Sequence, residues 1–293
     1  METENTNEVY KSRSLWEEAF RRLLKNKGAI VGAVFMILLI AAAIAAGFIY
    51  DYDTDVIGQN ISNRLKWPSR EHIFGTDELG RDIFTRVIYG ARYSLFIGFG
   101  SEAIGLIIGI ILGSLAGFHG GWVDMLVMRS ADVLYAIPNI MIAVVIVSLL
   151  GTSTVNLLIA LSVSSITSFA RIARAAVMQL RSQEYIESAQ AMGLPTWKII
   201  LKHVLPNILA PVIVQITLRV GSTIIAASSL SFLGIGVPSP APEWGAMLSS
   251  GRSQMRTASY ICIIPGLAIM FTVLALNLLG DGLRDALDPK LKK

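Results

Sequence analysis

The sequence contains few charged residues. Asp, Glu, Lys and Arg make up 16% of its 293 residues, whereas hydrophobic residues make up 53%; soluble domains carry about 25% charged residues. This shortage excludes an ordinary soluble globule and indicates an integral membrane protein. The formal net charge of +4 could suggest a nucleic-acid partner. However, the basic residues follow the ends of apolar runs, so we expect no nucleic acid to bind.

Cysteine is nearly absent, and so are the motifs of soluble enzymes. Cys262 is the only cysteine, which excludes an intrachain disulfide and leaves the redox compartment open. No GxxxxGK[ST] phosphate loop and no HExxH pattern occur, nor does a Ser/His/Asp arrangement in a polar domain. We therefore expect no catalytic residues, no metal and no cofactor in this chain.

Long apolar runs are what the sequence has instead. A bilayer core about 30 Å thick requires roughly 20 apolar residues in a helix. Six segments approach this length: 28–50, 93–118, 133–150, 154–170, 208–236 and 260–279. The first is too long for the core of a signal peptide and follows a charged segment, so we expect an uncleaved anchor. Pro138 predicts a kink in the third. The predicted fold class is an all-α integral membrane protein with six transmembrane helices.

The distribution of Lys and Arg predicts the orientation of these spans. When successive spans cross the membrane in alternating directions, most of the 25 basic residues fall on one side of the membrane. That side holds both chain termini and the segment between the fourth and fifth spans. Because Lys and Arg concentrate in cytoplasmic segments, we expect both termini to be cytoplasmic.

The segment 184–207, EYIESAQAMGLPTWKIILKHVLPN, is too polar for the membrane. It predicts two short helices, at 183–192 and 195–204. Gly193 suits the left-handed position that follows a helix, and Pro195 suits the first turn of the next. We call residues 184–207 the elbow, since the pattern predicts a compact helix–turn–helix outside the bilayer.

The elbow has two interpretations. Most segments of this kind only connect two spans, and Pro206 would end the second helix before the fifth span. A plain connector, however, is usually short and polar. This one would expose a set of apolar side chains: Tyr185, Ile186, Met192, Leu194, Trp197 and Ile200. That set indicates a docking surface for a cytoplasmic partner.

A second dense stretch, HIFGTDELGRDIFTRVIYGARYSLFIG, occupies residues 72–98. We expect Thr76 to cap an amphipathic helix that lies at the outer surface. Asp82 and Arg86 have the spacing of an i,i+4 ion pair. The alternative is a metal or substrate site made from His72, Asp77, Glu78 and Asp82, although carboxylates beside arginines are usually structural.

Two charged residues stand within predicted spans. Glu102 and Arg219 each lie about ten residues, or about 15 Å, into a span. Charges at this depth usually face the protein interior or a watery path. We expect them to line or flank a translocation path, either separately or as an ion pair. The alternative is a structural pair that fixes helix register.

Small and hydroxyl-bearing residues also follow helical spacing. Gly105, Gly109, Gly113 and Gly117 form a repeated GxxxG pattern that predicts close packing of another helix of this chain, rather than of a partner. Ser222 and Ser228 belong to a hydroxyl-rich run in the fifth span. They are candidates for the lining of a path, or else they bond to their own helix backbone.

The elbow resembles the coupling motif of ABC importer permeases. That motif runs Glu-Ala-Ala, three residues, Gly, nine residues, Ile, one residue, Leu-Pro. This sequence has Ser188 in place of the first Ala and His203 in place of Ile. In that family the motif seats in a cleft of a cytoplasmic ATPase. The resemblance implies that the residues contacting such a subunit are Glu187, Ala189, Gly193, Leu194, Pro195, Leu205 and Pro206.

Other stretches resemble the C-type permease of dipeptide and oligopeptide ABC importers. Residues 72–98 are similar to its FGTDxLGRDxxSRxxYGxRxSL pattern, with Thr85 in place of Ser. SLWEEAFRRLLKNKGAIVG near the N-terminus and SFLGIGVPSPAPEWGAMLSSGR at 231–252 are similar too. The resemblance implies a type I ABC importer permease fold in a bacterial or archaeal inner membrane. It also implies a segment 1–89 that includes the first span, a permease domain 90–281 and a tail 282–293.

The same resemblance implies partners and a function. The partners would be a second permease in a heterodimer, two ATPase subunits that bind ATP and Mg²⁺, and an extracytoplasmic peptide-binding protein. The function would be peptide import. Related importers carry nickel, other metal chelates or glycosides, so these stay alternatives.

A secondary transporter driven by an ion gradient is a different class of protein. Against it stand the lack of a clear inverted repeat and the lack of an acidic relay beyond Glu102. A structural scaffold would need no stiff elbow.

Overall fold

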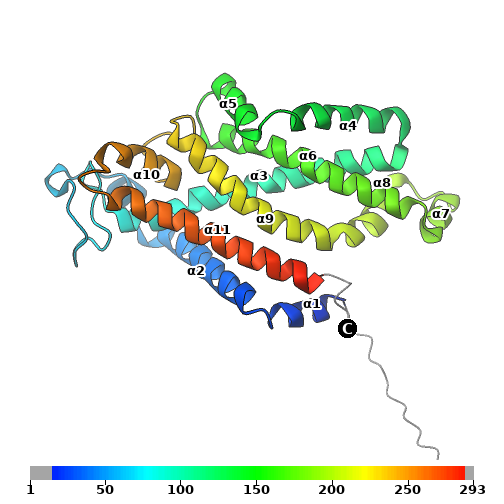
Figure 1. Ribbon diagram of the computed structural model, residues 1–293, viewed down its shortest axis with the longest axis horizontal. Coiled ribbons are helices and arrows are strands. Elements are labelled where there is room, and N and C mark those ends of the chain that lie inside the picture. Colours follow the sequence, from blue (N-terminus) through cyan, green and yellow to red (C-terminus); the bar gives the residue numbers. More distant parts are fainter. Residues whose placement is uncertain (1–14, 288–293) are drawn as a thin grey trace, which may run out of the picture.

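The computed structural model describes residues 15–287, and within that range it is a bundle of helices (Figure 1). Residues 15–287 contain no β-strand beyond an isolated bridge between Thr76 and Asp82. The all-α prediction is therefore confirmed. The helices are α1 Leu15–Leu23, α2 Lys27–Ile49, α3 Ile83–His119, α4 Gly121–Tyr135, α5 Asn139–Leu150, α6 Thr154–Arg181, α7 Glu184–Ala191, α8 Thr196–Ile199, α9 Leu205–Phe232, α10 Trp244–Gly251 and α11 Tyr260–Leu287.

Five helical segments are long and apolar enough to cross a membrane. They are α2, α3, α6, the continuous helix Thr196–Phe232 and α11. A sixth span arises if α4 and α5 are taken together, but the two meet at an angle of 93°. The predicted third span, 133–150, is therefore wrong as a single helix. Pro138 has no amide hydrogen and disfavours helical backbone before it, so α4 ends at Tyr135 and α5 begins after the proline.

The predicted surface helix in residues 72–98 is also corrected. Asp82, rather than Thr76, caps the helix: its carboxylate accepts from the Thr85 amide at 2.9 Å. The helix is the start of α3, and Ile83 is fully buried. The first turns of α3 are covered on one face by α10 and by the segment 51–82, and they lead directly into the predicted second span rather than forming a separate helix.

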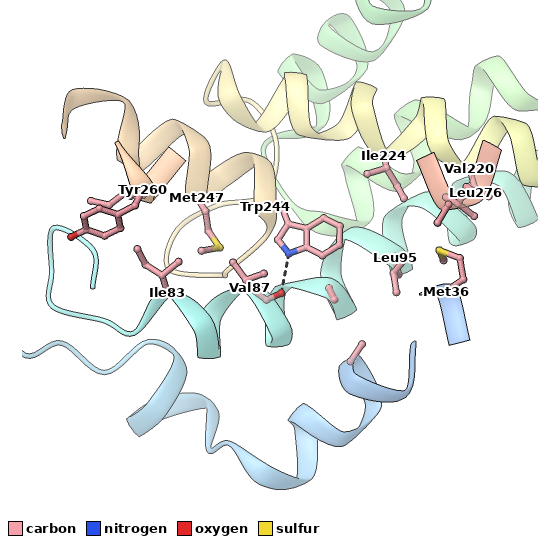
Figure 2. Close-up of a cluster of buried hydrophobic side chains, with 14 of the residues drawn as sticks. Met36, Ile83, Val87, Leu95, Val220, Ile224, Trp244, Met247, Tyr260 and Leu276 are labelled. Carbon is pink, nitrogen blue, oxygen red and sulfur yellow. Dashed lines mark hydrogen bonds between the residues drawn. The ribbon is translucent and has the colours of Figure 1, made fainter. Parts of the chain in front are cut away.

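Trp244 of α10 anchors this buried region (Figure 2). Its side chain is completely buried, and its indole Nε1 donates to the carbonyl oxygen of Val87 at 2.9 Å. The cluster around it continues through Leu95 of α3 and Ile224 of α9 to Met36 of α2. One hydrophobic core thus joins helices that are far apart in the sequence.

The glycine repeat packs α3 against α6. A Cβ at Gly105 would overlap Ser165, and one at Gly113 would overlap the backbone of Ala170. Only glycine lets the two backbones approach this closely. The prediction that the repeat packs within the chain is confirmed.

The molecule has two distinct ends. The elbow, α1 and the C-terminal end of α11 lie toward one end in Figure 1, whereas α10 and residues 51–82 lie at the other. The described ends of the chain thus lie toward the same end as the elbow.

Candidate functional site

The elbow consists of α7, a tight turn and α8. Gly193 has a φ of +76°, which costs glycine little and other residues more. Its amide donates to Gln190 O at 2.9 Å, and the Leu194 amide donates to Ala189 O at 3.1 Å. These two bonds satisfy carbonyls at the end of α7 in the pattern of a Schellman motif. The left-handed turn predicted at Gly193 is confirmed.

The second half of the elbow differs from its prediction. Pro195 lies just before α8 rather than in its first turn. Pro206 does not end a helix either, because it stands in the first turn of α9. A π-helical turn, Ile200–Val204, joins α8 to α9, and the Leu205 amide closes it on Ile200 O. The elbow therefore continues into the next span without a break.

A small hydrophobic core makes the elbow compact. Ile186 and Ala189 of α7 are buried with Ile199 of α8, and Leu194 from the turn and Phe118 from the end of α3 pack against them. The prediction that Ile186 is exposed is therefore wrong, since helical spacing places it on the inner face of α7. Ala189 is small because it packs within the elbow.

The outer face of the elbow keeps large apolar side chains in solvent. Met192 is 73% exposed and Trp197 is 59% exposed. Glu187 is exposed as well, and it borders a hollow of about 390 Å³ beside Arg181 at the end of α6. Among the remaining motif positions, Leu205 is half-buried and Pro206 is exposed. The outer face of the elbow thus combines exposed apolar and acidic groups, and docking of a partner on it stays a prediction.

The two charged residues of the spans form an ion pair. Arg219 Nε lies 3.1 Å from Glu102 Oε2. Glu102 is fully buried, and its second oxygen accepts from Ser165 Oγ at 2.7 Å and Thr223 Oγ1 at 2.6 Å. Buried carboxylates are stable only when paired and hydrogen-bonded in this way.

The guanidinium of Arg219 also binds the hydroxyls of α6. It donates to Ser168 Oγ at 3.0 Å, to Ser165 Oγ at 3.1 Å and to Ser164 Oγ at 3.3 Å. Sequence reasoning missed these partners. The signal was present, because three serines at 164, 165 and 168 share one face of a helix.

The other two candidates for a path lie in different surroundings. Ser222 is exposed, and its hydroxyl donates to Arg219 O at 2.8 Å within its own helix. Ser228 is buried beneath α10. Its backbone contacts Gly245 of α10 so closely that a side chain at position 245 would not fit. Of the two, only Ser222 faces outward.

Two of the three carboxylates in residues 72–82, those of Asp77 and Asp82, have partners other than a metal ion. Asp77 accepts from Arg81 Nε at 2.7 Å and lies 3.7 Å from Arg86 Nε, so the expected Asp82–Arg86 pair is wrong. His72 Nδ1 lies 3.0 Å from Asp82 Oδ1. Across residues 15–287, no group of three or more His, Cys, Asp or Glu side chains is arranged to hold a metal.

Comparison with known proteins assigns the chain to a family. Residues 109–293 match the model of the binding-protein-dependent transport system inner membrane component. Residues 14–68 match the N-terminal TM domain of oligopeptide transport permease C. The N-terminal stretch, the elbow and residues 231–252 fall within these two matches, whereas residues 72–98 lie between them.

Similar proteins agree with this assignment. The chain is 48% identical to the dipeptide transport system permease protein DppC of Alkalihalophilus pseudofirmus over 283 residues, which is 97% of this chain and 92% of that protein. It is 46% identical to the glutathione transport system permease protein GsiD of Pectobacterium atrosepticum over 281 residues, 96% of this chain and 93% of the relative.

A solved structure shares the fold. It is described as inward facing conformations of the MetNI methionine ABC transporter, and the match has a TM-score of 0.55 at 18% identity. The match covers 70% of this chain and 97% of that one. The fold is thus that of a type I ABC importer permease, and the chain belongs to the family of binding-protein-dependent transport system inner membrane components.

Proposed function

We propose that this chain is one permease subunit of an ATP-driven importer of short peptides. It would pair with a second, different permease and receive peptide from an extracytoplasmic binding protein. Two separate ATPase subunits would hydrolyse ATP, with Mg²⁺, because no phosphate-loop motif occurs in this sequence. Both termini would be cytoplasmic. The observation that carries the proposal is the compact elbow, whose exposed Met192 and Trp197 stand on a buried core of its own.

The cargo is proposed from the relatives. Proteins 48% and 46% identical to this chain are named for dipeptide transport and glutathione transport, and both names denote short peptides. Import of nickel, another metal chelate or a glycoside is the alternative cargo.

The structure supports a mechanism of coupling. The elbow continues through the π-helical turn into α9, so a push on the elbow moves α9 as well. α9 carries Arg219, which is bonded to Glu102 of α3 and to serines of α6. Because packed helices shift as rigid bodies rather than deform, α3, α6 and α9 would move together when ATPase subunits close on the elbow.

Glu102, Arg219 and Ser222 would lie beside the translocation path. Arg219 is partly exposed, and Ser222, which follows it by three residues in α9, is exposed. Glu102 is fully buried, so its role would be to hold Arg219 in position rather than to touch the peptide. Ser228 is left out of this lining because it is buried under α10.

A pull-down from membranes tests the elbow. The tagged chain should bring down a P-loop ATPase and a second permease. The double variant Gly193→Trp/Glu187→Arg should lose the ATPase and keep the permease, since a side chain at positive φ strains the turn and the new charge opposes docking. Gly234→Trp is a matched control, because Gly234 has a φ of +81° with open space around it and lies just after the end of α9, outside the elbow. An ATPase that stays bound to the double variant contradicts the docking role.

Uptake by the reconstituted complex tests the cargo. Proteoliposomes with internal ATP should accumulate a labelled dipeptide, and removal of ATP should stop uptake. Accumulation of a nickel chelate or a glycoside in place of the dipeptide would support the alternative cargo. Uptake by the purified chain without any ATPase would instead support an ion-driven transporter.

A further inference from the structure

An apolar groove runs between α2 and α3, away from the ion pair and the elbow. Its volume is about 580 Å³. From α2 it is lined by Ile40, Ile44 and Phe48, and from α3 by Phe96 and Phe99. Both helices are candidate membrane spans, and these side chains are at least 36% exposed. The groove therefore opens toward the lipid.

Arg92 closes one end of this groove. Its guanidinium packs against Gly47, in the space that a Cβ at that position would occupy, and lies 5.0 Å from the centre of the Tyr89 ring. Within residues 15–287, no carboxylate lies within 4.0 Å of it. Arg92 is thus an exposed cation that packs on Gly47 and Tyr89 and has no carboxylate partner among these residues.

The position of Arg92 matches the boundary between hydrocarbon and headgroups. Gly47 lies two residues before Ile49, the last residue of α2, so Arg92 is at the membrane end of this helix. From Phe48 to Ile40 the groove extends for about 12 Å along α2, most of the roughly 15 Å depth of one leaflet's hydrocarbon. Tyr89 and Tyr93 flank Arg92, as tyrosines do at membrane interfaces.

A second groove of about 390 Å³ lies on the other side of Arg92. It is lined by Tyr93 and Phe96 of α3 and by Thr154 and Val155 at the start of α6. Arg92 therefore stands between two grooves, as a phospholipid phosphate stands between two acyl chains.

We propose that this chain binds one phospholipid in the leaflet opposite the elbow. Arg92 binds the phosphate, because a guanidinium suits phosphate in charge and in geometry. One acyl chain fills the α2–α3 groove, and it ties α2 to the rest of the bundle. This site is independent of the cargo and of the ATPase partners.

Native mass spectrometry of the chain, purified with its accompanying subunits in mild detergent, tests the site. Delipidated complex is titrated with dioleoyl phosphatidylglycerol. Arg92→Gln should weaken binding of the tightest phospholipid roughly tenfold, because it removes a charge-assisted hydrogen bond. Ile44→Trp keeps the charge but fills the groove, and it should also weaken binding.

Two matched controls separate the site from general lipid contact. Arg64→Gln removes an exposed arginine from the same end of the molecule, and Ile37→Trp enlarges an exposed residue of α2 outside the groove. Both should bind as the unmodified chain does. Glycerol 3-phosphate, which has the phosphate without the acyl chains, should not compete.

Two results would overturn the proposal. One is unchanged phospholipid binding by both Arg92→Gln and Ile44→Trp. The other is a photocrosslinker at Phe48 that attaches to a second permease rather than to lipid, since a protein helix would then fill the groove.

Discussion

At the scale of single residues, the ion pair between Glu102 and Arg219 places two charges inside the predicted spans. Glu102 is fully enclosed and reaches three donors: the Arg219 guanidinium, Ser165 and Thr223. A buried ion pair contributes little beyond a well-packed apolar pair, but removal of one partner leaves an uncompensated charge. Single and double substitutions should therefore differ sharply.

Glu102→Ala should destabilise the protein by roughly 3–5 kcal/mol, because the Arg219 guanidinium loses its buried counter-charge. Glu102→Gln should destabilise the protein less than Glu102→Ala, since the carbonyl oxygen of glutamine can still accept from Ser165 and Thr223. Thermal unfolding in detergent, followed by the retention of monodisperse protein, measures both.

The double variant Glu102→Gln/Arg219→Gln separates stability from transport. It should unfold close to the temperature of the unmodified chain, since no charge stays unpaired, and it should transport poorly if Arg219 flanks the path. Normal assembly together with normal peptide uptake would leave the pair with a structural role only.

At the scale of elements, the pairing of α3 with α6 is set by glycine. Gly113 has the backbone of Ala170 where its own Cβ would be, and Gly117 faces Val177 and Arg174 O. The same pairing holds Phe118 at the base of the elbow, where it packs on the elbow's core. The packing of two spans thus fixes the position of the candidate docking surface.

Gly113→Val should destabilise the bundle by about 1–3 kcal/mol or more, because overpacking forces the two backbones apart. Gly221→Ala is the matched control, since the added methyl would lie 3.4 Å from Val273, an ordinary contact. Unfolding temperature in detergent and yield from membranes measure the difference. Equal stability of the two variants would mean that α3 and α6 do not pack so closely.

At the scale of the whole molecule, the two ends differ in character. One end carries α1, the elbow and the C-terminal end of α11, whereas the other carries α10 and residues 51–82. The proposed orientation places the first end in the cytoplasm, where Lys and Arg are concentrated. The phospholipid site would then lie in the outer leaflet.

Single cysteines in a Cys262→Ser background test this orientation. Arg70 and Met192 are both exposed, at opposite ends. A membrane-impermeant maleimide applied to spheroplasts should label Arg70→Cys and should label Met192→Cys only after permeabilisation. The reverse pattern would invert the orientation and remove the elbow from any cytoplasmic ATPase.

The sequence by itself determined what depends on local spacing. Apolar run length predicts the spans because a helix rises a constant amount per residue. The GxxxG repeat places four glycines on one face, and Gly193 predicts a left-handed turn because other residues are strained there. The elbow, the helical class and the family followed from such local patterns.

Only the tertiary structure decided which distant groups meet. Arg86 pairs with Asp77 rather than Asp82, and Ser165 reaches Glu102 from another helix. The 93° break between α4 and α5 exceeds the expected kink at Pro138, and a π-helical turn carries the chain past Pro206. These outcomes depend on contacts between residues far apart in the chain, whose energies local periodicity does not contain.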